Sequence, residues 1–354
     1  MEANPSHNPS PSCEWPIAVT KRQTRAAVLG AVISLCFIGL LLKRVDLHQT
    51  WTTLRGMDPR FLLVPLLMLG LNYPLRAWRW RLMFPRRTRP GYSHTFRTFA
   101  IGNGANNFVP GRGGDVARCM LIAGDSSLSG STLALGTLAV EKVLDGLALL
   151  AIVLLACVFI SPPGWLIKLL VAGAAIFGIA LVVMAALRYR AAWFVGLVAA
   201  ACARLRLTRL AGRLPDLFAA FAEGLHAISS FTLLLWLFTI TAMIWLTEAG
   251  LVWGIAKPLG VSLSLPDAVV VAAVLGLGLM IPAGPAAIGT YEFFVVAAMG
   301  LAGVASGTAL AYAVLLHSWV LVSSSLIGFT CLTWAGMSVQ GLLARDAPSL
   351  EKSL

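Results

Sequence analysis

Hydrophobic residues in this chain form long continuous runs that are separated by polar connections. A helix needs roughly 20 apolar residues to cross a bilayer, and six of the runs are close to that length. They cover residues 26–42, 61–80, 133–160, 165–187, 231–255 and 310–334. Apolar and polar positions do not alternate within the runs, so the pattern predicts transmembrane helices and not strands.

Two further apolar stretches are interrupted by glycine, proline and charged residues. The first begins as a weakly apolar segment at 96–108 and turns back through the glycine-rich residues 111–114. The second covers 267–281, breaks at Pro282 and continues from Glu292. Glycine and proline interrupt helices, and a break at membrane depth is tolerated only where protein buries it or water reaches it. We therefore predict two re-entrant helix pairs.

Basic residues flank the apolar runs and indicate a topology. Arginine is dense at 76–89 and at 188–213, whereas the turn at 161–164 has no charge. Tryptophan and arginine together at 76–81 are typical of an interface belt with snorkelling cations. Because cytoplasmic loops are rich in lysine and arginine, we expect both termini in the cytoplasm. One broken pair then enters from the cytoplasm and the other from outside, as an inverted repeat requires.

These elements predict an all-α fold, a polytopic helical membrane protein with about 8 membrane segments. We divide the chain into a tail at 1–20, a transmembrane domain at 21–340 with halves at 21–187 and 215–340, and a tail at 341–354. Of the 354 residues, 58% are hydrophobic and 12% are charged, whereas a soluble domain carries about 25% charged residues. The net charge of +12 is explained by the loop arginines, so we predict no nucleic-acid partner.

Two acids in the third run are candidates for chemistry. Glu141 and Asp145 are four residues apart and therefore share a helix face. A charge that faces lipid at the bilayer centre costs roughly 2.5–3.5 kcal/mol. We therefore expect both acids to face the protein interior and to pair with Arg112 or Arg118, while Lys142 points elsewhere. Two interpretations stay open: a direct role in substrate binding, or an ion-pair network that only stabilises helix packing.

The first broken pair carries a candidate anion site. The guanidinium groups of Arg112 and Arg118 can each bind two phosphate oxygens, and the backbone amides of residues 111–114 can add an anion nest. Asp115 would orient an arginine or offset its charge. Alternatively, these arginines are only a cytoplasmic topology signal.

Glu292 is the candidate acid of the second broken pair. It follows Gly289 at a helix start, where a carboxylate either caps the helix or faces a cationic headgroup or Arg112. Glu248 and His317 are secondary candidates, each inside an apolar run. No set of His, Cys, Asp or Glu has metal-ligand spacing, and the glycine-rich turn lacks the P-loop pattern, so we predict no metal and no cofactor.

Four motifs in this order resemble the lysylphosphatidylglycerol synthase transmembrane region, a flippase-like family. They are Arg76-Ala77-Trp78-Arg79-Trp80, the run from Asn107 to Arg118, Glu141-Lys142-Val143-Leu144-Asp145, and the run from Pro282 to Glu292. The resemblance covers roughly residues 25–335. The chain departs from the family pattern at Asp115, where glutamate is usual, and at Ala286-Ala287, where glycines are usual.

The resemblance implies a multi-pass protein of the cell inner membrane that moves lipids between leaflets. We therefore expect a flippase-like transporter, not an enzyme, for lipids with an anionic or zwitterionic headgroup. Its candidate substrate site comprises Asn107, Arg112, Asp115, Arg118, Glu141, Asp145 and Glu292. The sequence does not include the soluble aminoacyl-transferase domain of the fused synthases, so we do not expect it to make lysyl-lipid.

Two other functions stay open. One is a membrane scaffold or partner subunit for lipid or lipid-linked glycan synthesis, in which the polar residues only pack helices. The other is a membrane-embedded transferase with Asp115 or Glu292 as the base, although no connection is long enough to form a donor-binding domain. Besides membrane lipids, we expect either a homo-oligomer or a lipid-synthesis enzyme as partner.

Overall fold

The computed structural model describes residues 47–56, 58–124, 128–157, 162–204, 214–281 and 284–335. Within these ranges every regular element is a helix, which confirms the predicted all-α polytopic membrane fold. The tails predicted at 1–20 and 341–354, the first apolar run at 26–42 and the break at Pro282 lie outside the described residues.

Long helices form the frame of the molecule. Among the described residues, four stretches are long and apolar enough to cross a membrane, and they contain α3 (Leu63–Met83), α7 (Gly164–Tyr189), α11 (Phe231–Ala256) and α14 (Ser306–Trp334). α6 (Leu128–Ala156) has 29 residues, as many as α14, but it carries three charged residues near its middle. At 1.5 Å per residue such a helix reaches about 43 Å, more than the roughly 30 Å of the hydrocarbon core.

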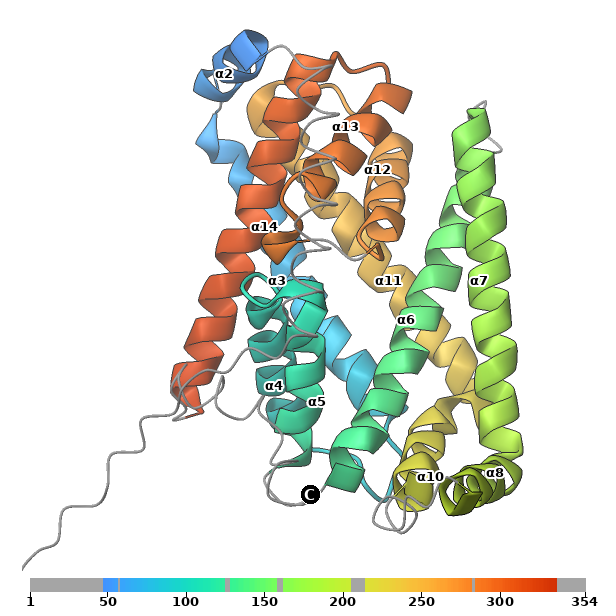
Figure 1. Ribbon diagram of the computed structural model, residues 1–354. Helices are drawn as coiled ribbons and strands as arrows, with labels where there is room; N and C mark the ends of the chain where they lie inside the picture. The colour runs from blue at the N-terminus through green and yellow to red at the C-terminus, as the bar shows by residue number, and fades with distance from the viewer. Residues whose placement is uncertain are drawn as a thin grey trace, which may run out of the picture.

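Two helix hairpins lie between the long helices. α4 (Tyr92–Ala105) and α5 (Gly113–Ala123) form one hairpin, and α12 (Leu265–Gly278) and α13 (Thr290–Leu301) form the other. The longest of these limbs has 14 residues, or about 21 Å, which is too short to cross the hydrocarbon core. The hairpins point toward each other from opposite ends of the molecule, and α14 runs beside both (Figure 1).

The tips of the two hairpins meet. The 3-10 turn η2 (Pro110–Arg112) joins the limbs of the first hairpin and contacts η5 (Pro285–Ala287) of the second. The structure thus contains the two broken helix pairs that the glycine and proline pattern predicts. The inverted repeat that would relate them stays a prediction.

Both tips have left-handed backbone. The φ angle is +67° at Gly111 and +58° at Arg112, and it is +55° at both Ala286 and Ala287. Glycine adopts this conformation readily, whereas a residue with a Cβ is destabilised by roughly 1–2 kcal/mol. Three non-glycine residues therefore hold strained turns where the hairpins meet, and such strain is often found at ligand sites.

Shorter helices cover the ends of the molecule. α2 (Leu47–Arg55) packs on α14, where the Thr50 hydroxyl donates a hydrogen bond of 3.0 Å to the Gly307 carbonyl. α8 (Ala191–Arg204) and α10 (Leu214–Gly224) lie beside the ends of α6 and α7 (Figure 1). The polar connections in these parts of the sequence are therefore partly helical.

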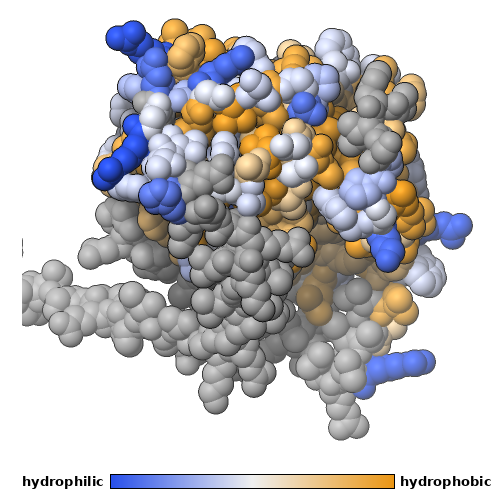
Figure 2. All heavy atoms as spheres, turned by 90° about the horizontal axis from the view of Figure 1, so that it is seen from above, coloured by the Kyte–Doolittle hydropathy of each residue, from blue (hydrophilic) through white to orange (hydrophobic). Residues whose placement is uncertain are grey.

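Apolar side chains form most of the outer surface. Among the described residues of α7, only Leu166 and Met184 are buried, whereas Val171, Ile179 and Val182 are exposed. Seen from above, the coloured surface is mostly hydrophobic or weakly polar, and the strongly hydrophilic side chains stand apart near its edge (Figure 2). A surface of this kind is suited to contact with lipid.

Glycine lets the first hairpin pack through its backbone. A Cβ on Gly114 would lie 2.1 Å from the Gly102 carbonyl oxygen, across the two limbs. A Cβ on Gly104 would lie 2.9 Å from the Ser324 carbonyl oxygen of α14. Small residues are the usual means by which helix backbones approach each other in membranes. These contacts hold the first hairpin closed and place its tip against α14.

We predict that Gly114→Ala destabilises the protein, because the added methyl overlaps with backbone that has little room to move. Overpacking typically costs about 1–3 kcal/mol, so the purified variant should unfold at a lower temperature in detergent than the wild type. Gly178→Ala is the matched control, since nothing lies within 4 Å of a Cβ added there. Equal unfolding temperatures for the two variants would contradict the close contact.

Candidate functional site

A cavity of about 390 Å³ lies where the hairpin tips meet, with further walls from α3, α6, α11 and α14. This volume is within the range of roughly 300–1,000 Å³ that is usual for small-molecule sites. Among the described residues, four cations and four acids line it: Arg76, Arg112, Arg118, Lys142, Asp115, Glu141, Asp145 and Glu248. The candidate residues from the first hairpin and from α6 are therefore together, except for Asn107.

The charged residues lie near the middle of the long helices. Glu141 and Asp145 are near the middle of α6, and His317, which also lines the cavity, is near the middle of α14. The hairpin tips also lie about halfway along α14 (Figure 1). The middle of a helix that crosses a bilayer lies near the bilayer centre, and ionisable groups there are by default candidates for a functional site.

Asp145 pairs with Arg79 of α3, and both residues are buried. Arg79 Nη1 lies 2.5 Å from Asp145 Oδ1, and Nη2 lies 3.1 Å from Oδ2, so the contact is bidentate. Nη1 also donates to the Thr241 hydroxyl of α11 at 2.9 Å. Arg79 is 0% exposed, so the expectation of a snorkelling interface cation at this position is wrong. The adjacent Trp80 is equally buried.

Glu141 pairs with Arg118 of α5, as the sequence predicts. Arg118 Nη2 donates to Glu141 Oε1 at 2.7 Å, and both side chains are buried. The guanidinium carbon also lies 4.6 Å from the centre of the Trp80 ring and 5.1 Å from that of Phe99. Aromatic faces attract cations at such distances. Arg118 is therefore held on several sides and has little freedom to follow a ligand.

Asp115 pairs with Lys142 at the cavity wall. Lys142 Nζ lies 2.8 Å from Asp115 Oδ2, and the Asn106 side-chain amide donates to the other carboxylate oxygen at 3.3 Å. The Lys142 side chain is 34% exposed and lines the cavity. The expectation that Lys142 points away from the site is therefore wrong, because α6 turns this face toward the first hairpin.

Arg76 and Glu248 form a further pair, of which sequence analysis named Glu248 as a secondary candidate and did not name Arg76 as a site residue. Arg76 Nη2 lies 2.8 Å from Glu248 Oε1, and Arg76 Nε donates to Asn72 Oδ1 at 2.7 Å. A signal was present in the sequence, since Asn72, Arg76 and Arg79 have the spacing of one helix face. That spacing predicts a polar stripe inside a bundle rather than a belt at its end.

Arg112 is the exception among the cavity cations. Its side chain is exposed and lines the cavity, and no carboxylate of the described residues lies within 4.0 Å of it. It therefore does not pair with Glu141 or Asp145, although the sequence made it a candidate partner.

Glu292 lies behind the cavity wall and has two roles. One carboxylate oxygen accepts the Gly289 backbone N–H at 2.7 Å, which caps α13 as one interpretation predicts. The other lies 2.5 Å from Nδ1 of His317. The residue that faces the cavity here is His317, whose Nε2 lies 2.9 Å from the Ala286 carbonyl oxygen.

Asn107 does not line the cavity. Its side-chain amide donates to the Ser324 and Ser325 hydroxyls, both at 2.8 Å, and to the Leu321 carbonyl at 3.2 Å. These bonds attach the first hairpin to the middle of α14. Asn107 therefore positions the first hairpin against α14.

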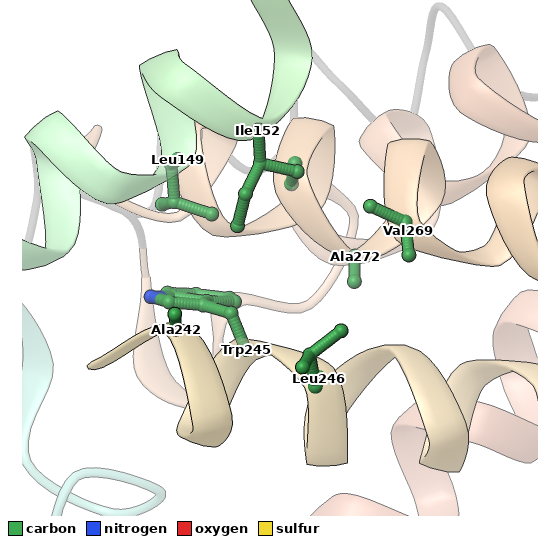
Figure 3. A pocket seen from close by; sticks show the side chains of 8 residues that line it. Leu149, Ile152, Ala242, Trp245, Leu246, Val269 and Ala272 are labelled. Atoms are coloured by element: carbon green, nitrogen blue, oxygen red, sulfur yellow. The ribbon is translucent and has the colours of Figure 1, made fainter. Parts of the chain in front are cut away.

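A second, apolar pocket of about 150 Å³ adjoins the cavity between α6, α11 and α12. Its side chains come from all three helices and surround one space, with Leu149 and Ile152 from α6, Ala242, Trp245 and Leu246 from α11, and Val269 and Ala272 from α12 (Figure 3). Trp245 and Ala272 also line the cavity, so the charged space and the apolar one adjoin at these two residues. The Arg76 guanidinium lies 5.7 Å from the centre of the Trp245 ring.

We predict that Asp145→Asn destabilises the protein by about 3–5 kcal/mol, because it removes the bidentate partner of buried Arg79 and leaves only Glu141, which lies 3.9 Å away and is already bound to Arg118. The double variant Arg79→Met, Asp145→Leu should recover most of that loss, since an apolar pair of similar volume needs no compensation. The measurement is the unfolding free energy of each variant in mixed detergent micelles. If the single and double variants are equally unstable, the pair is not the source of the effect.

The hairpins and the charged residues of the cavity lie within a stretch of sequence that matches a known protein family. A family model described as the lysylphosphatidylglycerol synthase TM region matches residues 27–328. Searches of curated proteins and of solved structures found no match to the chain. The matched stretch includes both hairpins and every charged residue that lines the cavity. The chain therefore belongs to the family of the lysylphosphatidylglycerol synthase transmembrane region.

Proposed function

We propose that this protein is a flippase-like transporter that moves a phospholipid, or another lipid with a polar headgroup, between the leaflets of the inner membrane. The observation that carries the proposal is a charged cavity at mid-height of the long helices, bounded by two helix hairpins from opposite ends of the molecule. Broken helices that meet around a midplane site are a common transporter arrangement. The family's name, which refers to the synthesis of a modified phospholipid, supports a lipid as the substrate.

Arg112 is the proposed contact for a headgroup phosphate. All four acids that line the cavity are already paired with arginine or lysine, so the charge of Arg112 is available to a ligand. A guanidinium group binds two phosphate oxygens at once. The first backbone amides of α5, at Gly113 and Gly114, follow it directly, and a helix N-terminus favours an anion. Arg118 acts through its charge, because its guanidinium is held by Glu141.

The cavity also has groups for a cationic part of a headgroup. The Glu248 side chain is 28% exposed and lines the same space as Arg112. An ammonium group near Glu248 and a phosphate near Arg112 would suit a zwitterionic lipid, whereas an anionic lipid needs only the second contact. The proposed substrate class therefore includes zwitterionic and anionic lipids.

The acyl chains would stay in apolar surroundings while the headgroup crosses. The apolar pocket beside Trp245 is about the size that takes one small apolar guest, and it borders the charged cavity. A chain segment placed there keeps its contacts with hydrocarbon while the headgroup lies on the other side of the tryptophan. This arrangement avoids the exposure of acyl chain to the polar cavity.

A membrane scaffold for lipid synthesis is the second candidate function. It is favoured by the complete pairing of the four cavity acids, since a network that only packs helices requires such pairing. In that case changes at the cavity would alter protein abundance and leave lipid movement unaffected.

We predict that Arg112→Gln slows translocation of a headgroup-labelled phospholipid in reconstituted vesicles by about tenfold or more. A hydrogen bond to a charged group contributes about 1.5–3 kcal/mol, which corresponds to roughly a tenfold to hundredfold change. The translocation rate of Arg112→Lys should lie between those of the wild type and Arg112→Gln, because lysine keeps the charge and loses the bidentate contact.

Arg87→Ala is the control, since it removes an exposed arginine that does not line the cavity. It should leave the rate unchanged. Equal rates for the wild type and Arg112→Gln, at equal amounts of folded protein, would reject the assignment of Arg112. If both proteins translocate lipid at that equal rate, another residue must provide the anion contact. If neither translocates lipid, the scaffold function is favoured.

A further inference from the structure

His317 connects the tip of the second hairpin to α14 through both of its ring nitrogens. Nδ1 lies 2.5 Å from Glu292 Oε1 of α13, and Nε2 lies 2.9 Å from the Ala286 carbonyl oxygen of η5. The ring stacks on Tyr291 with 4.0 Å between ring centres and 5° between ring planes. These three contacts determine the orientation of the imidazole.

The two hydrogen bonds require an additional proton. A carbonyl oxygen only accepts, so Nε2 must carry a hydrogen to bond Ala286. If Glu292 is ionised, Nδ1 must carry one as well, and His317 is an imidazolium. If Nδ1 carries none, the hydrogen is on Glu292. In both cases the pair holds one proton more than a neutral imidazole and a carboxylate together.

The other charged pairs around the cavity are not suited to proton exchange. Each cavity acid is paired with arginine or lysine, and these cations stay charged near neutral pH. The ionisable groups that line the space with His317 are Tyr73, Arg76, Arg112, Asp115, Arg118, Glu141, Lys142, Asp145, Glu248 and Tyr291. Histidine is the side chain whose charge ordinarily changes between about pH 5 and 8. Among the described residues around the cavity, His317 with Glu292 is the pair that can gain and lose a proton.

On the basis of the proposed transport, we infer that the His317–Glu292 pair is a proton-binding site that couples lipid movement to proton movement. The His317 side chain is 5% exposed and lines the cavity, so water that enters the cavity reaches the pair. Ala286 is a strained residue of η5, and η5 contacts η2, where Arg112 lies. The proton site is thus linked directly to the meeting point of the hairpins.

Loss of the proton breaks one link between the hairpin and α14. One N–H or O–H bond of the pair breaks, the proton passes to water in the cavity, and a neutral imidazole and a carboxylate are left. The ring then has one N–H for two acceptors. If the ring keeps its hydrogen bond to the Ala286 carbonyl, the Nδ1 lone pair faces the Glu292 carboxylate, which is unfavourable. If the ring keeps its hydrogen bond to Glu292, the Ala286 carbonyl of η5 loses its donor and the strained tip can relax.

Vesicle transport under a pH gradient tests the coupling. The probe is phosphatidylglycerol with a fluorescent headgroup, measured with the full chain in vesicles of unlabelled phospholipid. If one proton moves with each lipid, a gradient of one pH unit should shift the leaflet distribution by about tenfold. His317→Gln keeps an amide N–H but takes up no proton near neutral pH, so it should translocate without a response to the gradient. His94→Gln, which changes an exposed histidine of α4 that does not line the cavity, should respond as the wild type does.

A spectroscopic measurement tests the proton count without transport. Nitrogen-15 NMR of histidine-labelled protein at neutral pH, with His317→Gln for assignment, should show either two protonated ring nitrogens or a neutral ring. A neutral ring should accompany an infrared band of protonated Glu292, identified with Glu292→Gln. A neutral ring beside an ionised Glu292 would overturn the inference.

The two proposals fail in different ways. Translocation by the wild type that does not respond to the gradient overturns the coupling and leaves the transporter assignment in place. Absence of any translocation by the wild type overturns both. A His317→Gln variant that responds to the gradient as the wild type does also overturns the coupling.

Discussion

A charge inside the hydrocarbon layer persists only if another charge or hydrogen bond compensates it, and the arrangement of the helices in this protein follows from that constraint. Arg79 with Asp145 joins α3 to α6, Arg118 with Glu141 joins α5 to α6, and Arg76 with Glu248 joins α3 to α11. Each pair lies between helices that must therefore stay in contact. Together the pairs connect the first hairpin to three of the long helices.

α6 depends most on these partners. Its central charges set it apart from the four stretches that are apolar enough to cross a membrane by composition. The first hairpin precedes it in sequence and supplies Asp115 and Arg118 for two of those charges. We therefore interpret the hairpin and α6 as one folding unit, in which neither part is stable at membrane depth without the other.

The second hairpin is held in a different way. Strained alanines form its tip, and its link to α14 is a histidine rather than an arginine. Arginine pairs are permanent near neutral pH, whereas a histidine link depends on a proton. The structure thus combines a frame of lasting ion pairs around α6 with a more easily released contact at the opposite hairpin. This division agrees with the inferred release of the second hairpin's tip when the His317–Glu292 pair loses its proton.

The sequence by itself determined the helical class, the position of most long helices and the two broken pairs. These features depend on local properties: continuous apolar runs, and glycine and proline at the breaks. It also indicated that Glu141 and Asp145 face inward and that Arg118 is a partner, because the hairpin and α6 are neighbours in the chain. It did not indicate which cation pairs with Asp145, nor that Arg79 is fully enclosed and Lys142 faces the cavity.

Only the tertiary structure decided these matters, since such pairs join residues far apart in sequence. Arg76 and Glu248 are separated by 172 positions, and Arg79 and Asp145 by 66. Whether a basic residue near a helix end snorkels or enters a buried pair depends on which acid the neighbouring helix presents at the same depth. That information is a property of the packed bundle, because helix rotation and relative depth are set by contacts among all the helices together.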